Sequence, residues 1–237
     1  MEQENKLRIL VKFPTRERPK KFEEVIRRYI MMSKDKENIH YLISLDKNDP
    51  TLQQYLKLIE SLQAQITFVV GDSIGKIHAC NRDIDQVQSW DLLVLASDDM
   101  ICQKIGWDDI LRNEMLQHYP ELDGVLWHND GYTQTKLNTM CILGRKRFNK
   151  FNYIYHPDYT SLWCDNEFME VSNRDNKQTY FPDVLFRHEH YSNGIQYHHT
   201  QDNLLRKNER YFTEDKLVFE RRKAAGFPID RIKFVKR

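Results

Sequence analysis

The sequence predicts an α/β protein with a mostly parallel central sheet, helices on both faces of it, and a second half of mixed α+β structure. Through the first hundred residues, short runs rich in branched apolar residues alternate with stretches whose apolar residues recur at helical spacing. One run, residues 91–97, is almost continuously apolar, as is typical of a strand in the middle of a parallel sheet. Alternating strands and helices favour a doubly wound, Rossmann-like sheet with right-handed crossovers.

Each expected element has a local reason. The first strand, residues 7–13, ends at Pro14, which cannot donate to a sheet ladder, and Pro19 opens the helix that follows. Further strands are expected at residues 39–45, 66–71 and 91–97, and further helices over residues 52–62 and 76–88. Beyond Trp107 we expect a helix to about residue 118 and strands at residues 123–128 and 137–143, with less regular alternation.

Composition excludes several classes of protein. With 36 Lys and Arg against 35 Asp and Glu in 237 residues, the net charge of +1 gives no overall attraction to polyanions. The apolar runs are far shorter than the roughly 20 residues that a membrane span requires, and no apolar stretch of a secretion signal follows Met1. We therefore expect a single cytoplasmic domain over residues 1–237, with no membrane span.

Ligands of open α/β sheets bind at the carboxyl ends of the strands, so the residues that follow each strand are candidates for a site. They are Pro14, Thr15, Arg16 and Arg18 after the first strand, Asp46 after the second, Lys76 after the third, and Asp98 and Asp99 after the fourth. The first loop carries neither the GxGxxG of dinucleotide-binding enzymes nor a Walker A sequence, which removes the main support for those two classes.

Each candidate has a functional and a structural interpretation. Two adjacent carboxylates at the end of a buried strand need a compensating cation, and Mg²⁺ or Mn²⁺ would supply it, but helix capping by Asp98 or Asp99 is an equal alternative. Arg16 and Arg18 would bind a diphosphate or nucleoside, or else remain solvated. Asp46 is placed to accept hydrogen bonds from a ribose or a base.

Together these residues resemble the nucleotide-sugar-dependent glycosyltransferases of the GT-A fold, of the inverting family 2 type. The resemblance is carried by Pro-Thr-Arg at residues 14–16, Asp46, Gly-Lys-Ile-x-Ala-x-Asn at residues 75–81, and Ser-Asp-Asp-Met at residues 97–100. It implies that Asp99 holds Mn²⁺ or Mg²⁺, that Asp98 helps to hold sugar or ribose, and that Asp46 and Lys76 hold the nucleoside. The adjacent pair departs from the usual spaced DxD motif, which leaves the division of roles between Asp98 and Asp99 open.

The second half offers residues for the acceptor side. An inverting transfer needs a base for the acceptor hydroxyl, and residues 163–167 resemble the family's acidic acceptor-side motif, which implies Asp165 as base, Glu167 as second choice and Trp163 as a stacking platform. A structural loop is the alternative. His188 and His190 lie two apart in an expected strand and share a face, as two ligands of one ion would require, but for this pair alone a polar strand face is the favoured interpretation. The resemblance implies that one of them is a further metal ligand.

The resemblance implies a metal-dependent enzyme that moves a sugar from a nucleoside-diphosphate sugar to an acceptor hydroxyl with inversion. Residues 1–100 would bind the nucleotide sugar, residues 101–200 the acceptor, and residues 201–237 would form a C-terminal helical extension. The acceptor would be a glycan or, given basic residues at positions 20–21, 221–223, 233 and 236–237, a hydroxymethylated base in DNA. The alternatives are a metal-dependent nucleotidyltransferase and a non-catalytic carbohydrate- or nucleic-acid-binding module on the same fold.

Overall fold

The computed structural model describes residues 6–72, 74–190 and 203–229 and contains a seven-stranded sheet in the order β3-β2-β1-β4-β7-β6-β8. Its strands are β1 (Ile9–Thr15), β2 (Ile39–Asp46), β3 (Gln65–Gly71), β4 (Leu92–Leu95), β6 (Val125–His128), β7 (Ile142–Gly144) and β8 (Gln178–Phe181). A separate two-stranded sheet pairs β5 (Met100–Cys102) with β9 (Phe186–His188).

The first half of the main sheet is parallel. β1 lies between β2 and β4, β3 pairs with the outer side of β2, and all three pairings are parallel. β7 then joins β4 and β6 in antiparallel pairings, whereas β8 is parallel to β6. The expected architecture, a mostly parallel sheet with a mixed second half, is confirmed.

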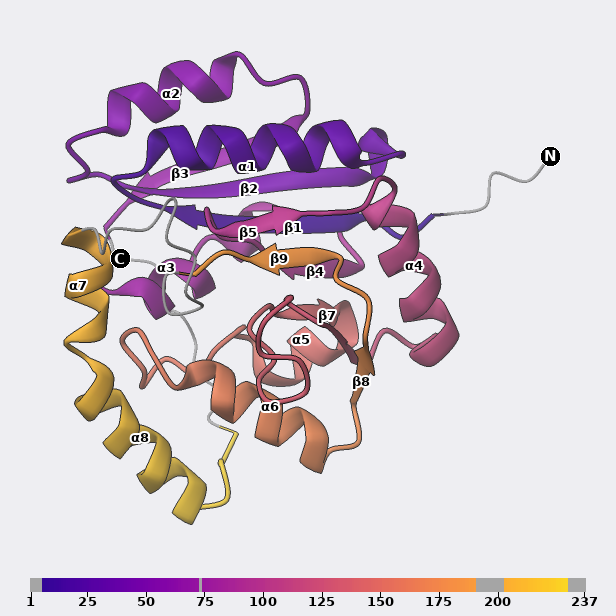
Figure 1. Cartoon of the computed structure of the whole chain (residues 1–237), viewed down its shortest axis with the longest axis vertical. Coiled ribbons are helices and arrows are strands. Elements are labelled where there is room, and N and C mark those ends of the chain that lie inside the picture. The colour runs from indigo at the N-terminus through magenta and orange to yellow at the C-terminus, as the bar shows by residue number, and fades with distance from the viewer. Residues whose placement is uncertain (1–5, 73, 191–202, 230–237) are drawn as a thin grey trace.

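Helices cover both faces of the sheet, with α1 and α2 on one side and α3, α5 and α6 on the other (Figure 1). The helices are α1 (Pro19–Met32), α2 (Leu52–Glu60), α3 (Lys76–Asn81), α4 (Trp107–His118), α5 (Arg145–Phe151), α6 (Cys164–Arg174), α7 (Asn203–Glu209) and α8 (Phe212–Ala224). Ile9, Val11 and Phe13 of β1 face a core shared with α1, α2 and α4, while Leu10 faces a second core shared with α3, α5 and α6. None of the described helices is long and apolar enough to cross a membrane.

Two expected boundaries were wrong for local reasons. β1 continues through Pro14 to Thr15. Pro14 is tolerated there because β4 pairs with β1 only as far as Lys12, so the proline, which has no N–H, interrupts no hydrogen bond to β4. The third helix ends at Asn81 and is followed by a short 3-10 turn, Ile84–Gln86. It ends because Arg82 adopts an extended backbone and its side chain turns back to the end of β2.

The expected strand at residues 137–143 is also shorter than predicted, since β7 begins only at Ile142. The segment before β7 is held by the carboxylate of Asp130, which accepts hydrogen bonds from the backbone N–H groups of Tyr132 and Thr133 and from the hydroxyl of Thr139. These local bonds compete with strand pairing and hold the segment as a loop.

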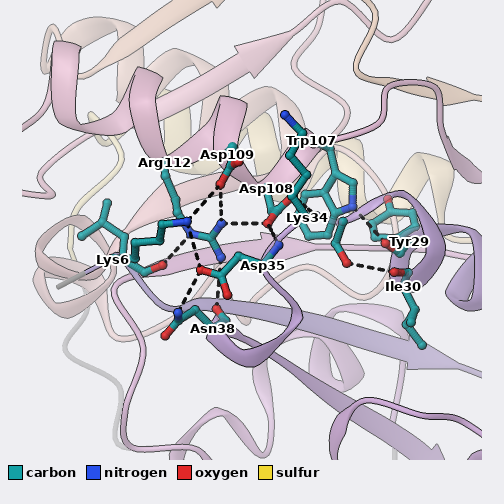
Figure 2. Close-up of polar contacts among 12 residues, drawn as sticks. Lys6, Tyr29, Ile30, Lys34, Asp35, Asn38, Trp107, Asp108, Asp109 and Arg112 are labelled. Atoms are coloured by element: carbon teal, nitrogen blue, oxygen red, sulfur yellow. Dashed lines mark hydrogen bonds and ion pairs between the residues drawn. The ribbon is translucent and has the colours of Figure 1, made fainter. Parts of the chain in front are cut away.

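A buried polar cluster joins α4 to the segment between α1 and β2 (Figure 2). The carboxylate of Asp108 accepts the N–H groups of Lys34 and Asp35, both at 2.9 Å, and it is fully buried. Arg112 binds Asp108 at 2.7 Å and donates to the carbonyl of Leu7 at 2.8 Å. The cluster therefore fixes the start of β1, the end of α1 and α4 relative to one another.

We predict that Asp108→Asn lowers the free energy of unfolding at pH 7 by about 2 to 3 kcal/mol, because it weakens a buried charge pair and two backbone hydrogen bonds. Burial opposes ionisation, but the N–H groups of Lys34 and Asp35 and the Arg112 guanidinium lower the pKa of Asp108. A carboxylate whose pKa is lower in the folded than in the unfolded protein stabilises the fold above its unfolded-state pKa, about 3.9 for Asp. This stabilisation is lost as the pH falls through the folded-state pKa.

The difference between wild type and Asp108→Asn should therefore shrink below about pH 4, as measured by urea unfolding at a series of pH values. Asp109→Asn is the control, since Asp109 also binds Arg112, at 3.1 Å, but is 32% exposed and should cost less than about 1 kcal/mol. Equal urea midpoints for wild type and Asp108→Asn at pH 7 would contradict this account of the cluster.

Candidate functional site

A cavity of about 630 Å³ opens at the carboxyl ends of β1, β2 and β4. Its walls come from the loop after β1, the start of α3, the segment after β4, the start of α6, the end of β9, and α7. Among the sequence-predicted residues it is lined by Pro14, Thr15, Arg16, Arg18, Asp46, Lys76, Asp98, Asp99, Asp165, His188 and His190. The structure thus gathers every predicted site residue at one cavity except Trp163 and Glu167.

The loop after β1 is held in shape by Tyr55 of α2. The Tyr55 hydroxyl lies 3.0 Å from the Thr15 hydroxyl and accepts the N–H of Arg18 at 2.8 Å. Glu17 takes a left-handed backbone (φ 57°), and its N–H donates to Asp49 at 2.7 Å. A non-glycine residue in this conformation is strained, and such strain persists where surrounding contacts hold it in place.

Asp46 lies between two arginines. Arg16 donates to Asp46 at 2.8 Å and to Asn48 at 2.7 Å, and the guanidinium of Arg82 lies 3.6 Å from the other oxygen of Asp46. Arg82 also donates to the carbonyl of Leu45 at 2.8 Å. The guanidinium of Arg16 is therefore engaged by protein acceptors, and the diphosphate or nucleoside clamp expected from the sequence stays a prediction.

Asp98 and Asp99 are compensated by different cations. Arg18 pairs with Asp98 at 2.8 Å, and His188 approaches Asp99 at 3.7 Å. Burial and the neighbouring Asp99 carboxylate raise the pKa of Asp98 to about 6, against the opposing effect of Arg18. Burial also opposes ionisation of Asp99, but His188, Ser97 and Lys76 lower the pKa of Asp99 well below its usual range. Neither side chain caps a described helix, which removes the alternative interpretation of this pair.

His188 reaches Asp99 through the pairing of β5 with β9. Met100 lies opposite His188 in this antiparallel pair, and the N–H of Glu189 donates to the carbonyl of Asp99 at 2.7 Å. The His188 imidazole also lies 3.8 Å from Asp130, and although burial opposes its charged form, Asp99 and Asp130 raise the pKa of His188 to about 9. His190 lies just beyond β9, its ring centre 5.5 Å from that of His188, and burial lowers its pKa to about 4.

The donor set fits a divalent ion of the Mg²⁺ or Mn²⁺ type. In the part of the chain that the structure describes, no three His, Cys, Asp or Glu side chains converge as a ready-made cage. Asp99 and His188 do converge, and hard divalent ions are commonly held by one or two protein ligands, with phosphate and water oxygens completing the shell. Asp99 supplies a carboxylate at the wall of the cavity, and the imidazole of His188 lies beside it.

Asp165 and Lys76 face the same cavity from the starts of α6 and α3. Burial raises the pKa of Asp165, and Lys76 opposes the shift. Lys76 also interacts electrostatically with Asp99, so its charge lies near both the candidate metal ligand and the candidate base. A carboxylate with a raised pKa is a better proton acceptor, because its basicity moves closer to the working pH.

Trp163 and Glu167 do not line the cavity. Trp163 takes a left-handed backbone (φ 63°), and its ring packs on Phe212 and Phe219 at centre distances of 5.4 Å. Glu167 is buried and receives two hydrogen bonds from Arg222, at 2.8 and 2.9 Å, and one from Tyr159 at 2.8 Å. The geometry thus gives both residues a structural role in joining α6 and its preceding loop to α8.

The basic run at residues 221–223 is also used structurally. Arg222 binds Glu167, Arg221 pairs with Asp158 at 2.8 Å, and Lys223 pairs with Glu170 at 2.7 Å. Each of these charges is matched by a nearby carboxylate, which weakens the support that this run gave to a nucleic-acid acceptor. The basic residues at 233 and 236–237 lie outside the described residues.

Sequence reasoning missed the contribution of α7. Leu204, Lys207 and Asn208 of α7 line the cavity at the spacing of one helix face, Tyr211 lines it just after α7, and Lys207 lies 3.5 Å from Glu17. That spacing was present in the sequence, but the segment was assigned only as an extension. Asp215 of α8 holds another part of the wall, since its carboxylate accepts the N–H groups of Thr160, Ser161 and Leu162, and Ser161 and Leu162 line the cavity.

The sequence matches no protein-family model and no curated protein. Solved structures do match. The mannosyltransferase PcManGT from Pyrobaculum calidifontis, in complex with GDP-Man and Mn²⁺, superposes with a TM-score of 0.62 at 13% identity, covering 93% of this chain and 74% of that one. S. aureus TarS superposes with a TM-score of 0.60 at 14% identity, covering 93% of this chain and 43% of that one.

A shorter form of TarS, residues 1–349, has been solved with UDP-GlcNAc and gives a TM-score of 0.57 at 16% identity, covering 76% of this chain and 57% of that one. The chain therefore spans less than two thirds of the length of either TarS structure. Its fold, with a cavity at the carboxyl ends of the parallel strands, is that of the GT-A-type nucleotide-sugar glycosyltransferases.

Proposed function

We propose that the protein is a metal-dependent glycosyltransferase that moves a sugar from a nucleoside-diphosphate sugar to an acceptor hydroxyl with inversion. Asp46 and Lys76 bind the nucleotide, Asp98 helps to hold ribose or sugar, and Asp99 with His188 holds Mn²⁺ or Mg²⁺. Residues 1–100 form the donor half and residues 101–200 the acceptor half. Residues 201–237 add α7 and α8, of which α7 lines the cavity.

The observation that carries the proposal is the convergence of Asp99, His188 and Asp165 on one cavity from distant parts of the chain. A bound divalent ion would neutralise the leaving diphosphate. Lys76 adds a second positive charge near the same place, and Asp165 is positioned to accept the proton of the acceptor hydroxyl. The matching structures that hold GDP-Man with Mn²⁺ and UDP-GlcNAc support this class of donor.

The direct test is hydrolysis of UDP-GlcNAc and GDP-Man, since a transferase without its acceptor slowly transfers the sugar to water. We expect release of UDP or GDP that requires Mn²⁺ or Mg²⁺ and is abolished by a chelator. NMR of the released sugar should show inversion at the anomeric carbon. Release that continues undiminished with a chelator would contradict the metal assignment, and retention would contradict Asp165 as the base.

We predict that Asp99→Ala weakens Mn²⁺-dependent binding of UDP or GDP by about tenfold or more, because the diphosphate is held partly through the ion. Calorimetry with and without Mn²⁺ measures the effect. Asp72→Ala is the matched control, since it removes the same charge from an exposed residue outside the cavity lining and should leave affinity unchanged. Wild-type affinity of Asp99→Ala in Mn²⁺ would exclude Asp99 as a ligand.

For Asp46→Asn we expect nucleoside-diphosphate binding to weaken by about 1 to 3 kcal/mol, because an acceptor held by Arg16 and Arg82 loses its charge. The ratio of affinities with and without Mn²⁺ should stay at the wild-type value, since the ion is bound elsewhere. If Asp46→Asn changes the ratio of affinities with and without Mn²⁺ but leaves the nucleoside affinity unchanged, Asp46 does not bind the nucleoside.

Asp165→Asn should lower kcat by about 10² to 10⁴-fold while changing UDP or GDP affinity less than about threefold, because asparagine keeps the size of the side chain but cannot accept the proton. Glu167→Gln is the control. It should lower the unfolding midpoint, since Glu167 binds Arg222 and Tyr159, and should leave kcat within about threefold at temperatures where the variant is folded. If Glu167→Gln lowers kcat by this factor and Asp165→Asn does not, Glu167 is the base and Asp165 is structural.

A further inference from the structure

Asp130 is a buried carboxylate that the proposed reaction does not use. It follows β6, is 3% exposed and does not line the cavity. Its two oxygens have different partners. Oδ1 accepts the N–H groups of Tyr132 at 2.9 Å and Thr133 at 2.7 Å, whereas Oδ2 accepts the hydroxyl of Thr139 at 2.9 Å and lies 3.8 Å from Nδ1 of His188.

The backbone ties Asp130 and His188 together as well. The N–H of His188 donates to the carbonyl of Asp130 at 3.0 Å, so the residue at the end of β9 is bonded to the loop after β6. The imidazole therefore lies between two carboxylates, with Nδ1 toward Asp130 and Nε2 toward Asp99 at 3.7 Å. Three segments distant in the sequence fix the direction of this one ring.

We propose that Asp130 is the positioning residue that orients His188, so that Nδ1–H faces Asp130 and Nε2 is the atom offered to the divalent ion beside Asp99. The inference rests on the proposed function to the extent that Asp99 and His188 hold that ion. A histidine ligand commonly gives its second ring N–H to a carboxylate, which fixes the ring and makes the ligating nitrogen more basic. It also selects His188 over His190 as the ligand, since His188 is the ring that spans Asp130 and Asp99.

Asp130→Asn isolates this role. Asparagine keeps an oxygen that can accept the N–H groups of Tyr132 and Thr133, so the loop retains its turn, and replaces Oδ2 with an NH₂ group that cannot accept a hydrogen bond from Nδ1–H. Asp108→Asn is the matched control, because it makes the same change in another buried aspartate that accepts two backbone N–H groups and does not line the cavity.

The first measurement is the Mn²⁺ dissociation constant by calorimetry, with Mn²⁺ alone and with UDP or GDP present. We expect Asp130→Asn to bind Mn²⁺ about 10- to 100-fold more weakly than wild type, and Asp108→Asn to stay within about threefold. Wild-type affinity in Asp130→Asn would overturn the inference, as would absence of Mn²⁺ binding by the wild-type protein in all three conditions.

The second measurement is made on the wild-type protein, and a variant serves only to assign its signals. In ¹⁵N spectra of histidine-labelled wild-type protein with Zn²⁺ as a diamagnetic probe, His188 should keep its proton on Nδ1 and bind the metal through Nε2. Subtraction of the His188→Gln spectrum assigns the signals. Metal bound through Nδ1, or to His190 instead, would overturn the inference. Absence of donor hydrolysis alongside the expected metal binding would overturn the proposed transferase activity and leave the role of Asp130 standing.

Discussion

The organisation of the site depends on one electrostatic constraint, the need to compensate two adjacent carboxylates at the end of a buried parallel strand. Asp98 and Asp99 cannot both be ionised in a poorly solvated place without nearby positive charge. Arg18 supplies it to Asp98 from the loop after β1, and in the metal-free protein the protonated His188 supplies it to Asp99 from β9. Each of these partners is itself held, Arg18 by Tyr55 and His188 by Asp130.

The helices beyond the main sheet maintain the walls of the cavity. Asp215 of α8 binds three successive N–H groups of the loop that precedes α6, and Arg222 of α8 binds Glu167 within α6. The position of Asp165, two residues before Glu167, therefore depends on contacts that never touch a ligand. A carboxylate whose surroundings are fixed in this way can keep a raised pKa and a constant direction, which a proton acceptor requires.

The sequence was sufficient for features that depend on local pattern. The strands and helices of the first half follow from periodicity, and because parallel strands end at one edge, Asp46, Lys76, Asp98 and Asp99 could be assigned to a common site before their side chains were seen. Features that depend on pairing between distant segments were harder to predict from the sequence. The approach of His188 to Asp99 requires the short β5–β9 sheet, and nothing near either residue indicates that pairing.

The placement of Trp163 and Glu167 away from the cavity has the same origin. Trp163, Asp165 and Glu167 lie in one short motif, but the left-handed backbone at Trp163 and the pairing of Glu167 with Arg222 turn two of these side chains toward α8 and leave only Asp165 at the cavity. The direction of a side chain at the start of a helix depends on what packs against it, and here that partner comes from the end of the described chain.

The central claim is that a divalent ion joins Asp99 and His188 to the diphosphate of the donor. Anomalous diffraction at the manganese edge, from crystals grown with Mn²⁺ and UDP or GDP, locates such an ion independently of any rate. The account predicts one strong anomalous peak, from a manganese ion coordinated by the Asp99 carboxylate, by Nε2 of His188 and by diphosphate oxygens. A nucleotide bound at the carboxyl ends of β1 and β2 with manganese absent from Asp99, or with the peak at another group of residues, would contradict it.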